Sequence, residues 1–450
     1  MVAAVNGAVP VPAALLIGGR GTHEFAILRE LGVRIVYLDN YVPLRCIPLV
    51  DIPVDVALDD WDEVLATARR LFPDVPPSGV LTHVEPQIPL AAFLTDRFGL
   101  GERGLSLEAA WNCRDKWRTR QALAAAGVPC PGYFLAHTED EVRGAAAELG
   151  LPVIIKPRNG AGGTQVRFCA TADEAVQAAA EVLGPPSAAP GLTGIPELTG
   201  TPGGAEIPGG GGVLVEEYVS GPEYAVQTLT RAGRTQIVSI FRQTVTPPPV
   251  FVELGYDFPA GLSVSDEREL GEIVLAAVAA VGIRDWISHT QVRRGSTGFK
   301  VIEVNARRPG GRLVEMTEAV SGVDLVRAAT QIALGQPVSP PAAPRARAAG
   351  YRSIVFPTSG MLVYESAASL DGLACGVPPI VELEVLSGQP VRPAQHPDGG
   401  VYGRIVVLGE GAEQVRQDLE RVRAALKMQV IPDQQIPVAG FDAREFKPCC

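Results

Sequence analysis

The chain has 450 residues, which is more than one hydrophobic core usually serves, so about two to four domains are expected. With 46% hydrophobic and 20% charged residues, its composition is that of a folded protein rather than a disordered one. The 39 basic and 50 acidic residues give a net charge of −11. A broad nucleic-acid-binding surface, which needs clustered Lys and Arg, is therefore not expected, although a local anion site stays open.

Seven cysteines are spread along the chain without any CxxC pair, so neither a disulfide framework nor a zinc site is indicated. The residues from Met1 to Pro12 lack the basic and apolar regions of a signal peptide. The longest apolar run, Ile273 to Gly282, is far too short to span a membrane. We expect a soluble, cytoplasmic protein with neither a nucleic-acid nor a membrane partner.

The N-terminal segment, residues 1–110, alternates between strand and helix patterns. Strands are predicted at 13–17, 33–38 and 79–82, and helices at 23–31, 61–72 and 87–98. Strands separated by helices are typical of a parallel sheet, so we predict a small doubly wound α/β domain here. The turn GGRGT after the first strand has Glu24 where a dinucleotide-binding GxGxxG motif needs glycine, and a dinucleotide site is not expected.

The middle segment, residues 111–340, is predicted to form a second domain. It opens with one long helix that carries Lys116, and its predicted elements lie at 111–126, 153–157, 213–219, 265–281, 287–292 and 299–307. Capping boxes at Thr138–Glu141 and Thr171–Glu174 predict two further helices. Residues 184–212 are rich in Gly, Pro, Ala and Thr and cannot build a core, so a flexible insert is predicted there.

The last segment, residues 350–450, is predicted to be a strand-rich α+β domain. It follows a Pro-rich, linker-like stretch at 337–349. Strands are expected in the sequences SIVF, GMLV, IVELEV and YGRIVV, and a helix is expected at 412–427. No concentration of chemically reactive residues is evident in this segment.

Three motifs carry the chemistry, and the first is the loop IIKPRNGAGGT. It places Lys156 at the end of an apolar strand, followed by small residues that let backbone N–H groups approach phosphate oxygens. The loop is not a Walker A motif, which needs GxxxxGK[ST]. Taken alone it is also typical of an ordinary hairpin turn, because Asn-Gly is a common turn signal.

The second motif, VLVEEYVSGPEY, gathers Glu216, Glu217 and Glu223 near a strand end. Carboxylates at this place could accept hydrogen bonds from ribose hydroxyls, and the neighbouring backbone could pair with an adenine edge. A solvated strand end is the alternative interpretation, because acidic side chains are mostly exposed.

The third motif, FKVIEVNARRPGG, is a predicted strand in which alternate residues share a face. One face would carry Val301, Glu303, Asn305 and Arg307, and the packing face would carry Ile302, Val304 and Ala306. A carboxylate and an amide beside a guanidinium are what a magnesium–triphosphate group needs. A half-exposed polar strand shows the same alternation, so this alternative stays open.

Together, in this order and spacing, the motifs resemble the ATP-grasp superfamily. The matching sequences are CRDKW, VIIKPRNGAGGTQV, VLVEEYVSGPEY and VIEVNARRPGG, and the resemblance covers nearly the whole chain. Within the superfamily the chain resembles the carboxylate–amine ligases that join amino acids or peptides, because TPPPVFVELGYDFPA is similar to a stretch beside their substrate pocket. The resemblance implies an ATP-grasp fold of the α/β class, with an N-terminal doubly wound domain and a C-terminal strand-rich α+β domain.

The resemblance further implies that the cofactors are ATP and Mg²⁺. Lys116 and Lys156 would hold the phosphates of ATP. A loop would close over these phosphates, and its residues would be Asn159, Gly160, Gly162, Gly163 and Thr164. Glu216 and the Val219 backbone would meet adenine, Glu223 would meet the ribose, and Glu217 belongs to the same nucleotide-binding set.

The remaining roles concern the metal and the substrate. Glu303 and Asn305 would bind magnesium. Arg307 would steady the transferred phosphoryl group and act with Lys156 as a catalytic residue. Glu253 would face the free amino group of a substrate, and Arg312 could meet a carboxylate.

Two positions depart from the pattern of the family. Gln291 stands where the family usually shows a metal-binding Glu, which predicts weaker binding of a second magnesium ion. Tyr256, counted with the substrate-binding residues, stands where the amino-acid ligases often show His.

The function expected from the resemblance is that of an ADP-forming ligase in peptide or natural-product biosynthesis, such as that of an antibiotic. It would activate a carboxylate as an acyl phosphate and join it to the amine of an amino acid or peptide. The two alternatives are a biotin-carboxylase-like enzyme and a nucleotide-binding module that has lost catalysis. The oligomeric state is left open, with a homodimer as one option.

Overall fold

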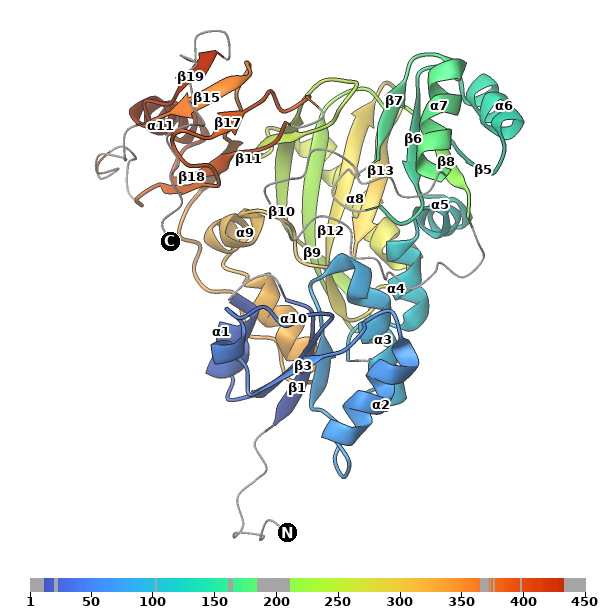
Figure 1. The fold of residues 1–450 in the computed structure, drawn as a ribbon, viewed down its shortest axis with the longest axis vertical. Helices are drawn as coiled ribbons and strands as arrows, with labels where there is room; N and C mark the ends of the chain where they lie inside the picture. Colours follow the sequence, from blue (N-terminus) through green and yellow to red (C-terminus); the bar gives the residue numbers. More distant parts are fainter. Residues whose placement is uncertain are drawn as a thin grey trace, which may run out of the picture.

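The computed structural model describes residues 12–19, 23–101, 103–160, 165–183, 211–364, 372, 374, 377–396 and 399–432. Gly162, Gly163, Thr164 and residues 184–210 of the predicted insert lie outside this part of the chain. Figure 1 shows an N-terminal unit at one end of the molecule, a large sheet in the middle with a smaller sheet beside it, and the C-terminal strands at the other end. No helix in the described ranges is long and apolar enough to cross a membrane.

The N-terminal unit is built on a parallel sheet with the strand order β3-β2-β1-β4. Its elements are β1 (Ala13–Ile17), α1 (His23–Glu30), β2 (Arg34–Asp39), η1 (Ile47–Leu49), β3 (Ile52–Asp55), α2 (Trp61–Leu71), β4 (Gly79–Leu81), η2 (Glu85–Gln87) and α3 (Ile88–Arg97). Residues of α2 and α3, such as Val64 and Leu90, pack on one face with Leu15 and Ile17. The predicted doubly wound α/β arrangement is therefore confirmed.

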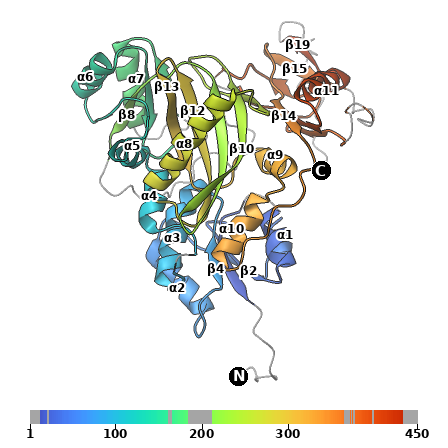
Figure 2. The same cartoon turned by 180° about the vertical axis from the view of Figure 1, so that it is seen from behind.

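The other face of this parallel sheet is completed by a helix from much later in the chain. α10 (Leu325–Ala333) lies against α1 and β4, as Figure 2 shows. Its Ile332 belongs to the same core as Leu16 of β1 and Leu28 of α1. The N-terminal unit therefore shares its core with the middle segment, and the division of the chain at residue 110 stays a prediction.

Two helices, not one, connect this unit to the rest of the molecule. α4 (Leu107–Arg114) ends before Asp115, and α5 (Lys116–Ala125) begins after it. The Asp115 carboxylate accepts a hydrogen bond from the backbone N–H of Trp117 and pairs with Arg158. A capping residue interrupts what the helical pattern indicates as continuous, so the predicted single helix at 111–126 is wrong. The break makes Lys116 the first residue of a helix.

A four-stranded antiparallel sheet with the order β5-β8-β6-β7 follows. Its elements are β5 (Tyr133–Ala136), α6 (Glu139–Leu149), β6 (Val153–Pro157), β7 (Arg167–Cys169), α7 (Ala172–Leu183) and β8 (Val213–Glu217). Both predicted capping boxes are confirmed, because the hydroxyls of Thr138 and Thr171 accept the expected backbone N–H groups. Val153 and Ile155 pack against the two helices. Alternation along β6 turns Lys156 to the opposite face.

The large sheet is antiparallel, with the order β13-β12-β9-β10-β11-β14-β18-β16. Its strands are β9 (Glu223–Arg231), β10 (Arg234–Val245), β11 (Glu253–Phe258), β12 (Trp286–Gly295), β13 (Gly298–Asn305), β14 (Ala348–Ser353), β16 (Ile380–Leu383) and β18 (Gly403–Gly409). Figure 2 shows α8 (Val264–Ala280) across one face of this sheet, with α9 (Leu313–Ser321) beside it. Because the sheet runs from the middle segment into the last one, the domain boundary near residue 340 also stays a prediction.

The C-terminal segment is rich in strands, as predicted. Besides the strands in the large sheet it contains β15 (Gly360–Val363), β17 (Pro390–Val391), α11 (Ala412–Ala425) and β19 (Gln429–Pro432). The strand expected in SIVF is wrong, because β14 ends at Ser353, the first residue of that sequence. β14 begins with Ala-Ala-Gly, and a Cβ at Gly350 would lie 2.6 Å from Leu419 of α11. Close packing of α11 requires small residues there. Ala and Gly have low strand propensity, so the sequence does not indicate this strand.

Gly79 determines how closely β4 and α10 approach each other. A Cβ at this position would lie 2.4 Å from the backbone oxygen of Ala333. We therefore expect Gly79→Ala to lower the free energy of unfolding by about 1–3 kcal/mol, because a backbone must shift to relieve the overlap. The melting temperature measured by calorimetry should fall accordingly.

Gly144→Ala is the matched control. Gly144 lies on the exposed side of α6, where a Cβ meets nothing within 4 Å. This substitution should leave the melting temperature unchanged or raise it, because Ala favours a helix over Gly. Equal melting temperatures for the two variants would contradict the packing argument.

Candidate active site

A cavity of about 350 Å³ lies between the small sheet and the large sheet. This volume is in the range of small-molecule sites, which is about 300–1,000 Å³. The candidates from the sequence that line it are Lys116, Lys156, Gly160, Glu216, Glu217, Val219, Glu223, Glu253, Tyr256, Gln291, Glu303, Asn305 and Arg307. Two other described candidates, Asn159 and Arg312, do not line the cavity. The fold thus brings together residues from five separate motifs, and Gln291 from outside them.

Lys156 is buried at the end of β6 and is held by a carboxylate of the adjacent strand β8. Its Nζ lies 2.7 Å from Oε2 of Glu216, which also accepts a hydrogen bond through Oε1 from Nε of Arg120 at 2.8 Å. Burial lowers the pKa of Lys156 to about 8, although Glu216 acts in the opposite direction. Burial raises the pKa of Glu216, but Arg120 and Lys156 outweigh this effect and hold it below its usual range. Two cations contact the Glu216 carboxylate. If Glu216 meets adenine, as predicted from the sequence, only its backbone is available for that contact.

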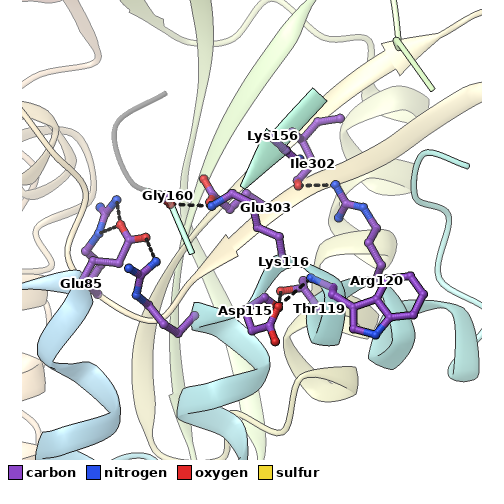
Figure 3. Close-up of polar contacts among 12 residues, drawn as sticks. Glu85, Asp115, Lys116, Thr119, Arg120, Lys156, Gly160, Ile302 and Glu303 are labelled. Atoms are coloured by element: carbon purple, nitrogen blue, oxygen red, sulfur yellow. Dashed lines mark hydrogen bonds and ion pairs between the residues drawn. The ribbon is translucent and has the colours of Figure 1, made fainter. Parts of the chain in front are cut away.

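Lys116 reaches the same cavity from the start of α5. Its Nζ lies 3.1 Å from Oε1 of Glu303 and donates a hydrogen bond of 2.6 Å to the carbonyl of Gly160, as Figure 3 shows. Burial raises the pKa of Glu303, but Lys116 and the side-chain amide of Asn305 outweigh it and hold the pKa well below the usual range. Glu303 is therefore ionised at neutral pH and has a cation beside it.

A β-bulge at Ile302 turns Glu303 into the cavity. β12 and β13 pair Gln291 with Glu303 and Val292 with Val301, which leaves Ile302 as the extra residue. Val301 lies in the core, and Ile302 lines the cavity. The prediction that Val301 shares the polar face and Ile302 the packing face is wrong, because a bulge shifts the alternation by one residue. Glu303, Asn305 and Arg307 keep the predicted face.

The oxygen donors around Glu303 fit a magnesium ion. Oδ1 of Asn305 is buried and has no hydrogen-bond partner. Gln291, directly opposite Glu303, donates its Nε2 to Oε1 of Gln243 at 3.2 Å. Carboxylate and amide oxygens are ligands that Mg²⁺ accepts. The described residues contain no group of three or more His, Cys, Asp or Glu side chains that could hold a metal, so an ion at this place would take further ligands from bound phosphates.

The N-terminal unit fixes Arg307. Nε and Nη2 of Arg307 donate hydrogen bonds of 2.9 and 2.7 Å to Oε2 of Glu85 in η2, and Arg114 lies 3.8 Å from the other carboxylate oxygen. The analysis of the sequence missed Glu85, because it lies in a Pro-containing turn without a recognised motif and 222 positions before Arg307.

Arg293 closes the opposite end of the cavity and was also missed. It donates to Oε2 of Glu223 at 2.8 Å and to the carbonyl of Val219 at 3.2 Å. Its guanidinium lies over the rings of Tyr218 and Phe251, 5.8 and 5.2 Å from their centroids. A signal was available, because Arg293 is two residues after Gln291 and therefore on the same face of β12.

Nearby, Glu217 is turned to the rim of the site. Nζ of Lys300 lies 2.7 Å from both of its carboxylate oxygens. Burial raises the pKa of Glu217, but a backbone hydrogen bond from Gly132 and the Lys300 ammonium outweigh it and lower the pKa. Both charges of this pair are thereby matched, and neither is free for catalysis.

Glu253 and Tyr256 of β11 form the remaining wall of the cavity. The Tyr256 hydroxyl donates a hydrogen bond of 2.5 Å to Oε2 of Glu253. Burial raises the pKa of Glu253, and no Lys or Arg of the described ranges forms an ion pair with it. Arg312, by contrast, is paired with Glu315 and Glu382 outside the cavity, so the structure does not bring it to the site.

Comparison with known proteins places these residues in a family. A model of the ATP-grasp domain matches residues 203–316, and one of the carbamoyl-phosphate synthase L chain ATP-binding domain matches residues 115–193. The chain is 30% identical over 332 residues to a D-alanine–D-alanine ligase of Alcanivorax borkumensis. The matched region covers 69% of this chain and 89% of that enzyme.

A second relative is the uncharacterized protein y4rH of Sinorhizobium fredii, which is 29% identical over 334 residues. The match covers 73% of this chain but only 64% of y4rH, so the chain spans less than two thirds of the length of this relative.

A solved structure has the same architecture. The crystal structure of an L-amino acid ligase from Bacillus licheniformis superposes with a TM-score of 0.73, covering 94% of this chain and 98% of that one at 23% identity. This likeness confirms the predicted fold. With the identity and coverage shared with the D-alanine–D-alanine ligase, the chain belongs to the ATP-grasp superfamily and resembles its carboxylate–amine ligases.

Proposed function

We propose that the protein is an ATP-dependent, ADP-forming ligase that joins a carboxylate to the amine of an amino acid or a peptide. The observation that carries this proposal is the composition of one cavity. Two lysines and the oxygen donors of Glu303 and Asn305 suit a triphosphate with its metal, and the unpaired carboxylate of Glu253 suits a cationic substrate group in the same space.

The nucleotide would lie between the two sheets. Lys116 and Lys156 supply positive charge for the phosphates, and the carboxylate of Glu223, held by Arg293, is available to a ribose hydroxyl. The Val219 backbone would meet the adenine. Magnesium, when bound, would neutralise phosphate charge, and Glu303, Asn305 and Gln291 would hold it.

The reaction proceeds in two steps. An oxygen of the substrate carboxylate attacks the γ-phosphorus of ATP, the bond to the β-phosphate oxygen breaks, and an acyl phosphate and ADP form. The amine nitrogen then attacks the acyl carbon, phosphate leaves, and the nitrogen loses a proton to give the amide. Glu85 orients Arg307, and three of the five N–H groups of Arg307 make the hydrogen bonds seen in the structure. The remaining N–H groups can donate to the transferred phosphoryl oxygens. Positioning and charge neutralisation account for most of the rate in such transfers.

Glu253 favours a substrate with a cationic group over bicarbonate. A buried carboxylate is costly unless a charge or hydrogen bonds compensate it, and only the Tyr256 hydroxyl is seen to donate to Glu253. An ammonium group would complete this compensation, whereas bicarbonate would add a second negative charge. The position of Glu253 therefore supports an amino acid or peptide as the acyl substrate.

The test of the proposal is ADP formation across a set of amino acids and amines with magnesium and ATP. Amine-dependent ADP release with an amide product would support the ligase. Turnover that requires bicarbonate would favour a carboxylase instead, and nucleotide binding without hydrolysis of any substrate would favour an inactive module.

The variant Glu253→Gln sharpens this test. It keeps the shape of the side chain but removes the charge, so the Michaelis constant of the amino-acid substrate should rise by about tenfold or more while that of ATP changes little. Glu267→Gln, on the exposed side of α8, is the control and should change neither constant. Equal increases for both substrates would place Glu253 away from the acyl group.

Lys156 predicts an alkaline limit for nucleotide binding. Its pKa is about 8, so the ammonium is charged below this pH and becomes neutral above it. The affinity for ATP should therefore fall as the pH rises through about 8, which calorimetric titrations at several pH values would measure. Lys156→Arg should remove this fall, because Arg stays protonated throughout. A fall with an unchanged midpoint in Lys156→Arg would assign it to another group.

Gln291 predicts an unusually high requirement for magnesium. An amide oxygen can bind the ion but lacks the charge of the carboxylate usual in the family. Gln291→Glu should lower the free magnesium needed for half-maximal turnover several-fold, whereas Glu303→Gln should abolish turnover. Gln236→Glu adds the same charge on the exposed start of β10 and serves as the control. Identical magnesium titrations for Gln291→Glu and the wild type would put Gln291 outside the metal site.

A further inference from the structure

Arg120 connects three elements that line the cavity without lining it itself. Its side chain is 1% exposed, and its Nε and Nη2 donate to the two carboxylate oxygens of Glu216 at 2.8 and 3.2 Å. Nη2 also donates to the carbonyl of Ile302 at 2.7 Å, the contact that Figure 3 shows. One guanidinium thus joins α5, β8 and the bulge of β13. Any effect of Arg120 on a ligand must act through the residues it contacts.

The charges in this cluster do not cancel. Arg120 and Lys156 each carry one positive charge, and Glu216 carries one negative charge between them. The three side chains are nearly inaccessible, so water screens these charges only weakly. Without Arg120, Lys156 and Glu216 would form a neutral buried pair at 2.7 Å. Such a pair would offer no net charge to a phosphate.

We propose that Arg120 is a positioning residue that neutralises Glu216, so that the charge of Lys156 stays available to the phosphates of a nucleotide. This inference rests on the nucleotide-binding role proposed above for Lys156. It explains why a lysine that should bind phosphate lies in direct contact with a carboxylate. Glu216 holds the Lys156 ammonium in place, and Arg120 compensates the charge that Glu216 brings.

The other charged groups around Lys156 do not take this role. Lys116 of α5 repels Lys156, and it is engaged by Glu303 of β13 at 3.1 Å. Glu303 acts on Lys156 through space, and no ion pair between them is seen in the described ranges. Glu216 and Arg120 therefore set the charge that Lys156 presents.

The variant Arg120→Gln tests the proposal by calorimetric titration with magnesium and ATP. At about pH 6.5, where Lys156 is protonated, we expect the dissociation constant to rise by about tenfold or more, because the cluster loses its net charge. The alkaline midpoint of binding should move above its wild-type value, because Arg120 no longer lowers the pKa of Lys156. Arg118→Gln lies on the same helix with its Nε on Asn112, and its dissociation constant should stay within about twofold of the wild type.

The double variant Arg120→Gln/Glu216→Gln separates charge from structure. It removes one positive and one negative charge and leaves Lys156 with its own, so the affinity should return to within about threefold of the wild type. The alkaline midpoint should fall below the wild-type value, because Glu216 no longer supports the Lys156 charge. A merely structural role predicts the opposite, since removing two contacts would weaken binding further. Should Arg120→Gln not fold, the double variant makes the same test, because it removes the Glu216 carboxylate together with the two hydrogen bonds that Arg120 donates to it.

Two outcomes overturn the proposal. One is that Arg120→Gln binds ATP as tightly as the wild type. The other is that the double variant folds but binds ATP no better than Arg120→Gln. If Arg120→Gln does not fold, the corresponding outcome is a double variant that binds ATP more than about tenfold worse than the wild type. A wild-type protein that binds no ATP would instead contradict the proposed function, so the two failures are distinguishable.

Discussion

The site depends on one buried carboxylate, Glu216, and the two cations that compensate it. A carboxylate in the protein interior is costly unless it is paired and hydrogen-bonded, so the position of Glu216 fixes the positions of Arg120 and Lys156. Because Arg120 also binds the carbonyl of Ile302, the same cluster ties the small sheet to the bulge that presents Glu303. The placement of Lys156 relative to Glu303 is thus set by ion pairs and hydrogen bonds in the core.

The N-terminal unit takes part in the site and does more than flank it. Glu85 orients Arg307, and Glu24 accepts a hydrogen bond of 3.0 Å from Arg308, so adjacent arginines of the ATP-grasp segment are both held by the same unit. α10 returns to cover the N-terminal sheet, and Ile332 packs beside Leu16. Segments that are distant in the sequence are therefore neighbours in space, because residues near position 330 cover the hydrophobic face of the N-terminal sheet.

The cavity has two chemically different ends. Around Lys116, Lys156 and Glu303 the charges favour anions with a metal, whereas around Glu253 a buried carboxylate favours a cation. Gly311 follows β13 with φ of +57°, a conformation that favours glycine, and a Cβ added there would lie 3.9 Å from Oε1 of Glu253. Under the proposed function, the first end would take the phosphates of the nucleotide and the second would take the amino group of the acyl substrate.

The sequence by itself determined the ATP-grasp family, the doubly wound N-terminal sheet and most of the residues that line the cavity. Lys156, Glu303, Asn305 and Arg307 were predicted because each lies in a contiguous motif whose chemistry is local. Only the tertiary structure decided the partners of these residues, since Arg120 is 96 positions from Glu216 and Glu85 is 222 positions from Arg307. It also decided the bulge at Ile302, because the register of a strand depends on the neighbouring strand. The helix break at Asp115 was likewise decided there, because the Asp115 carboxylate that caps α5 is paired with the distant Arg158. Local patterns record which side chains face a core, but the pairing of buried charges is decided where distant segments meet.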